Sequence, residues 1–427
     1  MAGISQNEVA IVASGLVSPV GVGFEAHAKV VHEGPATEMA GAGCLGGALK
    51  DFNPVPYLSD RKVMKAISAT DAIGLVAIED LKKNLRAEKS SAPMGNPWRC
   101  GLYVGAPSAF ASDNENYLEA VSASADYEGH VSMAKFGQEC MSSRPNTLLI
   151  GLPNNVLCYG SVILGIQGPN SNYTSGELSG MVALAAAARR LRRGQVDKAV
   201  AGAFTAQHER IISKVFDYYG VGNSTKVTTD AGAFFAMERF GERSDESSGA
   251  VADEERKTVA VLMGFGFGSA GIQLDFTAES HVATTCVTQD AMVDATECAI
   301  ESALADAGVT TESVGLILAG STGIPEVDRR EFLVLSRVFA KGRTFPALGS
   351  LTAVMGNMME AGGLLEVVLG GEIWQRQSVP PHLRPAGAGV IEMTEKFPAK
   401  LADSGQRITL IVRTSPWGEA AAVVVRY

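Results

Sequence analysis

The segment that decides the fold reads Ile-Gln-Gly-Pro-Asn-Ser-Asn-Tyr-Thr-Ser-Gly-Glu-Leu-Ser-Gly over residues 166–180, and an alanine-rich run then leads to Arg-Arg-Gly-Gln-Val-Asp-Lys-Ala-Val-Ala-Gly-Ala at 192–203. Apolar side chains recur between them at helical spacing, which predicts one helix from about Leu178 to Arg193. Arginines gather in its last turn, where the helix dipole stabilises cations, and Gly194 ends it. Val196 to Ala203 is predicted to be a short buried strand. A turn, an apolar helix and a buried strand in succession indicate the interior of an α/β protein.

The composition indicates a soluble globular protein. The 427 residues are 46% hydrophobic and 19% charged, which is enough apolar material for a large core. The net charge is -10 and no long basic stretch is present, so nucleic acid and an anionic membrane are not expected partners. No run approaches the ~20 apolar residues of a membrane span, and no charged-then-apolar leader is present, so we expect a cytoplasmic protein. An acidic carrier protein would need a local basic patch.

The cysteines are scattered and form no metal-ligand or redox spacing. We therefore expect free, mostly buried thiols in a reducing cytoplasm, with no metal and no cofactor. The six residues are Cys44, Cys100, Cys140, Cys158, Cys286 and Cys298.

Strands and helices alternate along both halves of the chain. The first half is predicted to contain strand Val9–Gly15, a helix from about Phe24, a long helix over 61–86, strand Cys100–Val104 and a strand over 230–238. The polar stretch 241–257 is the most loop-like, so we place a boundary there, between an N-terminal half (1–250) and a C-terminal half (251–427). The second half is predicted to contain strand Val259–Gly264, helix 290–307, strand Val314–Ala319, helices 327–339 and 358–376, and strands Ile408–Val412 and Ala420–Arg426. This order favours an α/β fold with helices on both faces of its sheets.

The central segment resembles a known family. Gly-Pro-Asn (168–170), Ser-Gly (179–180), Arg-Gly-x-x-Asp (193–197) and Ala-Gly (201–202) look like the central motif of β-ketoacyl synthases. Gly-Leu-Val-Ser-Pro-Val-Gly (15–21) is similar to the first strand and turn of that family, and the resemblance covers nearly the whole chain. It implies a thiolase-like fold, in which two duplicated halves form a five-layer αβαβα sandwich with the central helices between two sheets.

The resemblance also locates the position of the family's catalytic cysteine, on the sharp turn before the central helix. In this chain that position is Glu177. The helix N-terminus can hold a carboxylate, but a carboxylate cannot take an acyl group into a transferable thioester as a thiolate does. The nucleophile that the family requires is therefore missing.

Two segments of the second half resemble the sequence motifs that surround the family's two catalytic histidines, and we call these motifs the histidine frames. Ile-Leu-Ala-Gly-Ser-Thr-Gly-Ile-Pro (317–325) has Gly320 at the first histidine position. Ser-Leu-Thr-Ala-Val-Met-Gly-Asn (350–357) has Asn357 at the second histidine position and Thr352 at the lysine position. In the family, these histidines decarboxylate the malonyl extender and stabilise the resulting charge. All three catalytic positions have thus lost their side-chain type, while the frames around them survive.

This combination resembles the chain-length factor, or ketosynthase β subunit, of type II polyketide synthases. The resemblance implies a subunit without catalytic residues, inactive alone, which pairs as a heterodimer with an active ketosynthase in an acyltransferase complex. Acyl carrier protein and the growing polyketide chain would be its other partners. Many chain-length factors carry Gln where this chain has Glu177. We expect Glu177 to be structural, accepting backbone N–H groups at the helix start.

The same resemblance implies that bulky side chains of this subunit close the far end of a chain tunnel at the dimer interface. The segment 127–138 corresponds to that region, with Met133 and Phe136 as the best candidates and His130 behind them. For any one of these residues, ordinary interface packing is the alternative.

Two other functions remain open on the sequence. One is a stand-alone malonyl-carrier decarboxylase that uses Glu177, although Gly320 and Asn357 speak against it. The other is an unusual condensing enzyme with another nucleophile, for which Cys158 is the candidate; a buried core cysteine is the simpler interpretation of that residue.

Overall fold

The chain is described here from a computed structural model. It describes residues 8–33, 47–49, 52–87, 95–107, 115–143, 150, 152–206, 228–241, 258–271, 274–275, 284–285, 288–322, 324–342, 344–382, 396–398, 400–401 and 405–427. The predicted boundary at 241–257 lies, apart from residue 241, outside the described residues.

Five strands of the first half form one twisted run of the main sheet. In spatial order they are β4 (Asn170–Tyr173), β3 (Cys100–Gly105), β5 (Lys198–Thr205), β6 (Ala231–Arg239) and β1 (Val9–Ser18), and β2 (Gly21–Val22) pairs with the end of β1. β4, β3 and β5 run parallel, whereas β6 is antiparallel to both β5 and β1.

The second half repeats this arrangement strand for strand. Its order is β11 (Ala347–Gly349), β10 (Leu316–Ala319), β12 (Ile408–Thr414), β13 (Glu419–Arg426) and β7 (Ala260–Ser269). The first three are parallel, and β13 is antiparallel to its two neighbours. The identical order and directions bear out the predicted duplication. Two short strands, β8 (Leu274–Asp275) and β9 (Thr284–Thr285), pair apart from the main sheet.

The two halves are joined where one strand of each pairs with the other. β1 pairs with β7 through Val9, Ala10 and Ile11, so the two runs of strands are joined into one eleven-stranded sheet of the described chain. The resemblance had implied two sheets; the structure adds this short antiparallel junction between them.

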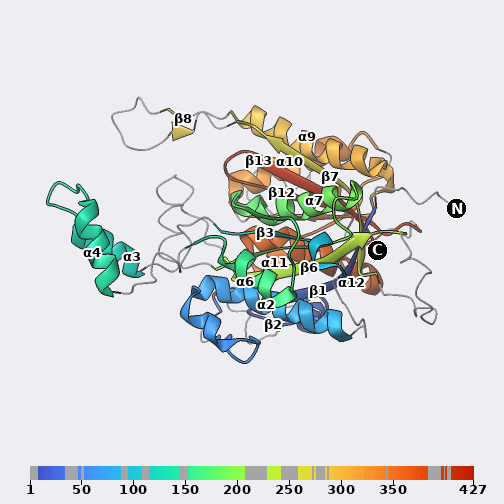
Figure 1. Cartoon of the computed structure of the whole chain (residues 1–427). Helices are drawn as coiled ribbons and strands as arrows, with labels where there is room; N and C mark the ends of the chain where they lie inside the picture. Colours follow the sequence, from blue (N-terminus) through green and yellow to red (C-terminus); the bar gives the residue numbers. More distant parts are fainter. Residues whose placement is uncertain are drawn as a thin grey trace.

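Helices form three layers around these strands (Figure 1). α2 (Ala69–Ala87) and α6 (Asn155–Leu164) cover the outer face of the first half, and α9 (Gln289–Ala307) and α10 (Pro325–Phe339) cover that of the second. α7 (Ser179–Arg192) and α12 (Met359–Arg376) lie between the two runs of strands, and α1 (Phe24–Glu33) packs against α12. The result is the five-layer αβαβα sandwich, a thiolase-like fold.

Small residues set how closely these layers approach. Gly264, Gly266 and Gly268 alternate along β7, and a Cβ at any of them would overlap the backbone of α9 near Ala295, Ala299 or Ala303. The alanines recur every four residues, so they form one face of the helix. The glycine stripe and the alanine stripe therefore allow α9 to lie directly on the strand.

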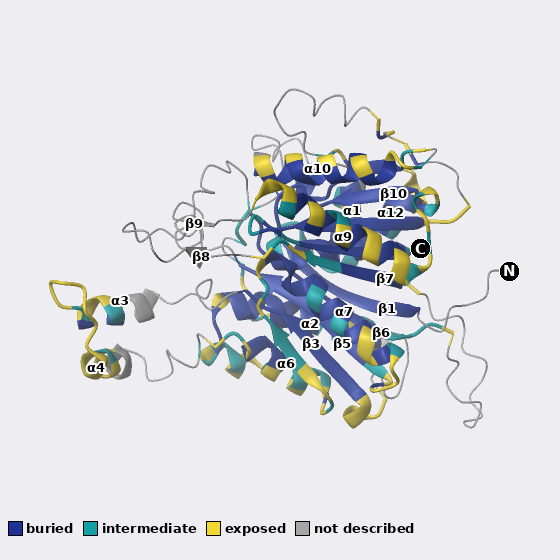
Figure 2. Ribbon diagram, turned by 90° about the horizontal axis from the view of Figure 1, so that it is seen from above, coloured by how far each residue is buried: buried dark blue, intermediate teal, exposed yellow. Residues whose placement is uncertain are grey.

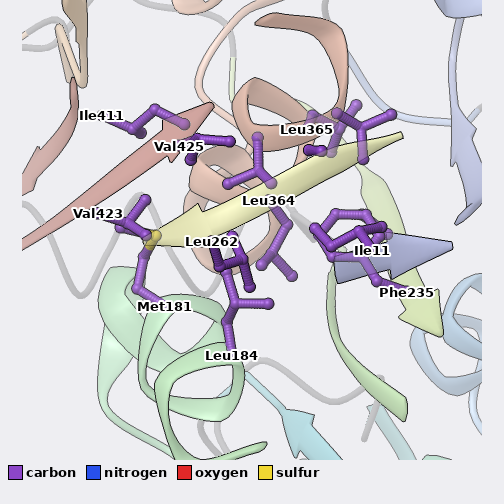
Figure 3. Packing of buried hydrophobic residues seen from close by; sticks show 14 of the residues in the cluster. Ile11, Met181, Leu184, Phe235, Leu262, Leu364, Leu365, Ile411, Val423 and Val425 are labelled. Atoms are coloured by element: carbon purple, nitrogen blue, oxygen red, sulfur yellow. The ribbon is translucent and has the colours of Figure 1, made fainter. Parts of the chain in front are cut away.

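The largest core lies around the two central helices. Met181 and Leu184 of α7 and Leu364 and Leu365 of α12 pack among side chains from both runs of strands, such as Phe235 and Val423 (Figure 3). Each fully buried side chain of this size contributes about 1.5–3 kcal/mol. The predicted central helix is confirmed to within one residue at each end.

The predicted long helix over 61–86 is wrong in its first third. The chain forms the 3₁₀ turn η2 (Arg61–Lys65) first, and α2 begins only at Ala69. Ser68 and Asp71 build a reciprocal cap, in which Ser68 N donates to the Asp71 carboxylate and Asp71 N donates to Ser68 Oγ, both at 3.0 Å. This Ser-x-x-Asp pattern was the overlooked helix-start signal.

The remaining elements are short or peripheral. They are α3 (Glu115–Ser124), α4 (Met133–Ser143), α11 (Thr352–Met355), and the 3₁₀ turns η3 (Pro97–Arg99), η5 (Gly176–Leu178) and η6 (Thr311–Ser313). Of the cysteines whose side chains are described, Cys100 is buried as expected, but Cys158 and Cys298 are exposed, so the prediction is wrong for these two. No helix of the described segments is long and apolar enough to cross a membrane.

Candidate functional site

Glu177 lies in η5, directly before the central helix α7, and is buried. Ser179 holds the turn around Glu177: its Oγ accepts from Ser175 N at 2.8 Å and donates to Gly176 O at 2.7 Å. Among the described residues, Glu177 Oε1 has no hydrogen-bond partner. Oε1 therefore does not accept a backbone N–H group at the helix start, as was expected of Glu177.

Burial determines the protonation state of Glu177. Removal from water raises the pKa of this carboxyl to about 8, the charge of Arg413 lowers it, and the acidic groups of Glu360, Asp328 and Glu331 raise it further. The side chain is thus largely a neutral carboxylic acid at pH 7, and not the carboxylate that the helix dipole would favour. A neutral acid can donate a hydrogen bond or a proton.

The turn that begins at Gly320 follows β10 and is held by carboxylates of α10. Glu331 Oε1 accepts from Gly320 N at 3.2 Å and Glu331 Oε2 from Ser321 N at 3.1 Å. Thr322 Oγ1 donates to Asp328 Oδ1 at 2.9 Å. Ser321 has a φ of 44°, an uncommon conformation for a residue with a side chain, so these contacts stabilise a strained turn.

Thr352 and Asn357 hold the same turn from the other side. Thr352 Oγ1 donates to Gly320 O at 2.7 Å, and Asn357 Nδ2 donates to Thr322 O at 3.4 Å. Asn357 Oδ1 accepts from Met359 N at 2.9 Å. The two segments singled out in the second half are thus brought together, and Asn357 has the hydrogen-bonded surroundings usual for a buried amide.

The sequence reasoning missed Arg413, the residue that organises this site. It lies on β12 and is buried, and its Nε forms an ion pair with Glu366 Oε2 at 3.3 Å. Its Nη1 donates to Gly320 O at 3.0 Å and approaches Thr352 Oγ1 at 3.5 Å. Two features of the sequence could have indicated a buried arginine here: it follows an apolar strand, and the facing helix has glycines at 362 and 363.

Several buried acids surround Arg413. Burial raises the pKa of Glu366 to about 8 and those of Glu331 and Glu360 to about 7. Arg413 opposes this shift at Glu331 and Glu366, while a hydrogen bond from Thr205 opposes it at Glu360. We call these residues the Arg413 cluster: Arg413, Glu177, Asp328, Glu331, Glu360 and Glu366.

The chemistry that this arrangement can perform is narrow. Glu177, Gly320 and Asn357 provide neither a thiolate nor an imidazole at the three positions. Among the described residues, no group of three or more His, Cys, Asp and Glu side chains is arranged to hold a metal ion. What remains is a protonated carboxyl beside a buried guanidinium.

The other predicted residues lie elsewhere. α3 and α4 pack on each other and stand apart from the body (Figure 2); α4 carries Met133 and Phe136, and His130 lies between the two helices. Met133 is 73% exposed, His130 is exposed beside Asp126 and Glu128, and Phe136 is partly buried. The structure does not bring them to Glu177. We call α3 and α4 the arm. Cys158 lies on the exposed side of α6, in the outer layer.

Comparisons with known proteins agree with this geometry. The family "Beta-ketoacyl synthase, N-terminal domain" matches residues 6–236, and "Beta-ketoacyl synthase, C-terminal domain" matches residues 269–385. The 3-oxoacyl-[acyl-carrier-protein] synthase 2 of Vibrio cholerae is 24% identical over 410 residues, 89% of each chain. The putative polyketide beta-ketoacyl synthase 2 of Streptomyces cyaneus is 24% identical over 399 residues, covering 89% of this chain and 87% of that protein.

Solved structures share the fold. The ishigamide ketosynthase/chain length factor has a TM-score of 0.73 at 15% identity, with 98% of each chain covered. A beta-ketoacyl synthase from Burkholderia phymatum has a TM-score of 0.70 at 17% identity, with 98% of this chain and 99% of that chain covered.

Proposed function

The chain belongs to the β-ketoacyl synthase family, and from this premise we propose that it is a chain-length factor: a subunit that does not condense acyl groups itself, but pairs with an active ketosynthase and shapes the tunnel for the growing chain. The observation that carries the proposal is the state of the three catalytic positions. They hold Glu177, Gly320 and Asn357, and a buried arginine lies where the two histidine frames meet.

Each substitution removes a different part of the condensation reaction. A glutamic acid cannot carry an acyl group as a transferable thioester. Gly320 has no side chain with which to bind a developing negative charge. The amide of Asn357 is already engaged with Thr322 O and Met359 N. Loss of all three parts together favours a subunit over an enzyme with a variant mechanism.

Surface features near β4 support pairing with a second chain. β4 ends the strand order of the sheet, and among the described strands only β3 pairs with it. α6 contacts β4 and carries the exposed apolar Val162 at 78%, and Leu152, just before α6, is 43% exposed. The partner that we propose is an active ketosynthase, a chain of the same fold whose equivalent edge could continue the sheet.

The arm supports the proposed role in chain length. Met133 of α4 is 73% exposed and Phe136 is partly buried, on a part of the chain that stands apart from the body (Figure 2). We propose that the arm reaches the partner and that these side chains, with His130 behind them, close the far end of the partner's tunnel.

A local basic patch supports acyl carrier protein as a second partner. η2 exposes Arg61, Lys62 and Lys65 within five residues, next to the exposed Tyr57, in a chain whose net charge is -10. Acidic surfaces are steered towards such patches. We propose that the acidic carrier protein docks on η2.

A malonyl-carrier decarboxylase is the second candidate, because the raised pKa of Glu177 suits a proton donor to a carbanion. The burial of Glu177 and the position of Arg413 speak against it, since a substrate would have to displace both.

The deciding experiment follows malonyl-loaded carrier protein with the purified chain alone and then mixed with a matching active ketosynthase. We expect turnover only in the mixture, abolished when the partner's cysteine is replaced and retained with Glu177→Ala and with the closer match Glu177→Gln. Carbon dioxide release by the chain alone, lost in both Glu177 variants, would establish the decarboxylase instead.

A further inference from the structure

We infer that Arg413 is a positioning residue: it fills the space left at Gly320 and keeps the former catalytic site closed. This inference rests on the proposed function, because a closed site is useful only in a subunit that does not condense. It gives a second reason why the chain does not condense acyl groups: the site lacks the catalytic side chains, and the side chain of Arg413 also blocks it.

The space for Arg413 is provided by two glycines. A Cβ at Gly362 would overlap the guanidinium at Nη2, so the arginine lies directly on the backbone of α12. A Cβ at Gly320 would meet Arg413 Cδ and Glu331 Oε1, both at 3.2 Å, which is tighter than ordinary van der Waals contact. A larger side chain at 320 would have to extend further into the same volume. A histidine at 320 and an arginine at 413 therefore compete for one space.

The contacts of Arg413 join three elements. Its Nη1 donates to Gly320 O at the end of β10, and its Nε pairs with Glu366 of α12, while Arg413 itself belongs to β12. Thr352 donates to the same carbonyl oxygen, so this oxygen accepts two hydrogen bonds. Loss of the arginine would leave the fully buried Glu366 facing the space that the guanidinium group occupied.

The charge of Arg413 acts on acids from separate parts of the chain. It lowers the pKa values of Glu177, Glu331 and Glu366 against the burial that raises them. With Arg413 absent, these carboxyls would hold their protons more firmly. The site would then consist of neutral acids around a hole with the size and shape of a guanidinium group.

The first test is a double-mutant cycle on the melting temperature of the full chain, with Gly320→His and Arg413→Ala. We expect Gly320→His to lower the Tm of the wild type by on the order of 5–10 °C. The same substitution made in Arg413→Ala should lower the Tm of that variant by less than about half as much. The matched control is Arg330→Ala, which removes another buried arginine that bonds Ser415 O instead of Gly320 O. In that background the full penalty should persist. Additive shifts with Arg413→Ala would overturn the inference.

The second test adds guanidinium chloride to the variants. At ~20 mM the ion should raise the Tm of Arg413→Ala by a few degrees, since it can occupy the hole and restore the positive charge that lowers the pKa of Glu366. It should not raise the Tm of the wild type or of Arg413→Met, in which the hole is filled. Sodium chloride and urea at the same concentration control for ionic strength and denaturation. If guanidinium does not raise the Tm of the single variant Arg413→Ala, the variant has no guanidinium-shaped hole and this part of the inference is wrong.

A third variant covers the case in which Arg413→Ala does not fold. Arg413→Val ends before the Cδ that a Cβ at 320 would meet and suits the strand β12, and the same relief of the Gly320→His penalty is expected in it. Turnover of malonyl-loaded carrier protein by the wild-type chain alone would refute the proposed function without changing the result of the double-mutant cycle. An additive cycle would refute the role of Arg413 alone.

Discussion

Arg192 Nη1 donates to Asp306 Oδ2 at 2.7 Å and thereby joins the central helix α7 to the outer helix α9 at an irregularity of β7. There the register with β13 shifts, and Met263 has no residue opposite it. Met263 O accepts from Arg192 Nη2 at 2.7 Å, and Phe265 N donates to Asp306 Oδ2 at 3.0 Å. The two side chains thus satisfy backbone groups that the bulge leaves unpaired.

We expect Arg192→Met to destabilise the chain by about 1–3 kcal/mol, because Met263 O loses its donor and Asp306 its cation. Urea unfolding of the full chain measures the change. Arg193→Met is the matched control, as Arg193 is exposed one residue further along the chain, and it should change stability by less than about 0.5 kcal/mol. Equal effects of both variants would mean that the bulge does not need Arg192.

Stability should fall as the pH rises from about 4.5 to 8. Burial raises the pKa values of Glu177 and Glu366 from 4.5 to about 8 and those of Glu331 and Glu360 to about 7, so these four groups hold protons in the folded chain that the unfolded chain releases near pH 4.5. The folded state therefore binds more protons in this window, and each such group costs about 1.4 kcal/mol per pH unit. Above the folded pKa, both states have released the proton and the loss is complete.

Glu177→Gln isolates the share of one group, because glutamine stays neutral at every pH. Its stability relative to the wild type should increase between pH 5 and 8, by roughly the slope of one proton. Glu119→Gln on the exposed face of α3 is the control and should leave the slope unchanged. A wild-type profile that is flat over this range would contradict the burial of protonated acids.

The contact of β7 with α9 gives a prediction about packing. Gly266→Ala should destabilise the chain by about 3 kcal/mol or more, because the new Cβ would overlap Ala299 O and the backbone cannot yield as a side chain can. Gly137→Ala in α4 is the opposite case: a Cβ there meets nothing within 4 Å, and alanine favours a helix over glycine by up to about 1 kcal/mol. Thermal unfolding of both variants provides the comparison.

The arm gives a prediction about product length. In a complex with an active ketosynthase, Met133→Ala and Phe136→Ala together should lengthen the product by one or more two-carbon units, because removing bulk opens the end of a channel. Mass spectrometry of carrier-bound or released chains measures this. Lys135→Ala, an exposed residue of the same helix, should leave the product distribution unchanged. Unchanged products in the double variant would refute the assignment of these two residues.

The basic patch on η2 gives a prediction about carrier binding. Replacing Arg61 and Lys62 by glutamate should weaken binding of acyl carrier protein at least tenfold at low salt, with a smaller difference at high salt, where charges are screened. Surface plasmon resonance at two ionic strengths measures both effects. Replacing the exposed Arg337 and Lys341 of the outer layer in the same way should have little effect. A loss that does not depend on salt would indicate misfolding.

Much of the fold could be predicted because its signals are local. The central helix follows from apolar residues at helical spacing, and Gly194 marks its end. The predicted helix over 61–86 begins too early because its apolar stripe includes Ala66, whereas the cap formed by Ser68 and Asp71 sets the start of α2 at Ala69. Periodicity alone does not register such a cap.

The site was predictable in position but not in chemical state. Glu177, Gly320 and Asn357 could be located from the frames around them. The raised pKa of Glu177 could not, since it depends on burial by segments far apart in the sequence. Arg413 was missed for the same reason: the predicted strand ended at Val412, and only the folded chain places residue 413 on Gly362.

The junction of β1 with β7 has a consequence for synthesis on the ribosome. β1 is made first, but its neighbours in the sheet are β6 (Ala231–Arg239) and β7 (Ala260–Ser269), and Glu8 pairs with Arg426 across 418 positions of sequence. Apart from its last residues, which pair with β2, the first strand therefore lacks its sheet neighbours until more than half of this sequence has been translated. Slow folding and a dependence on chaperones during that interval are the expected result of such distant pairing.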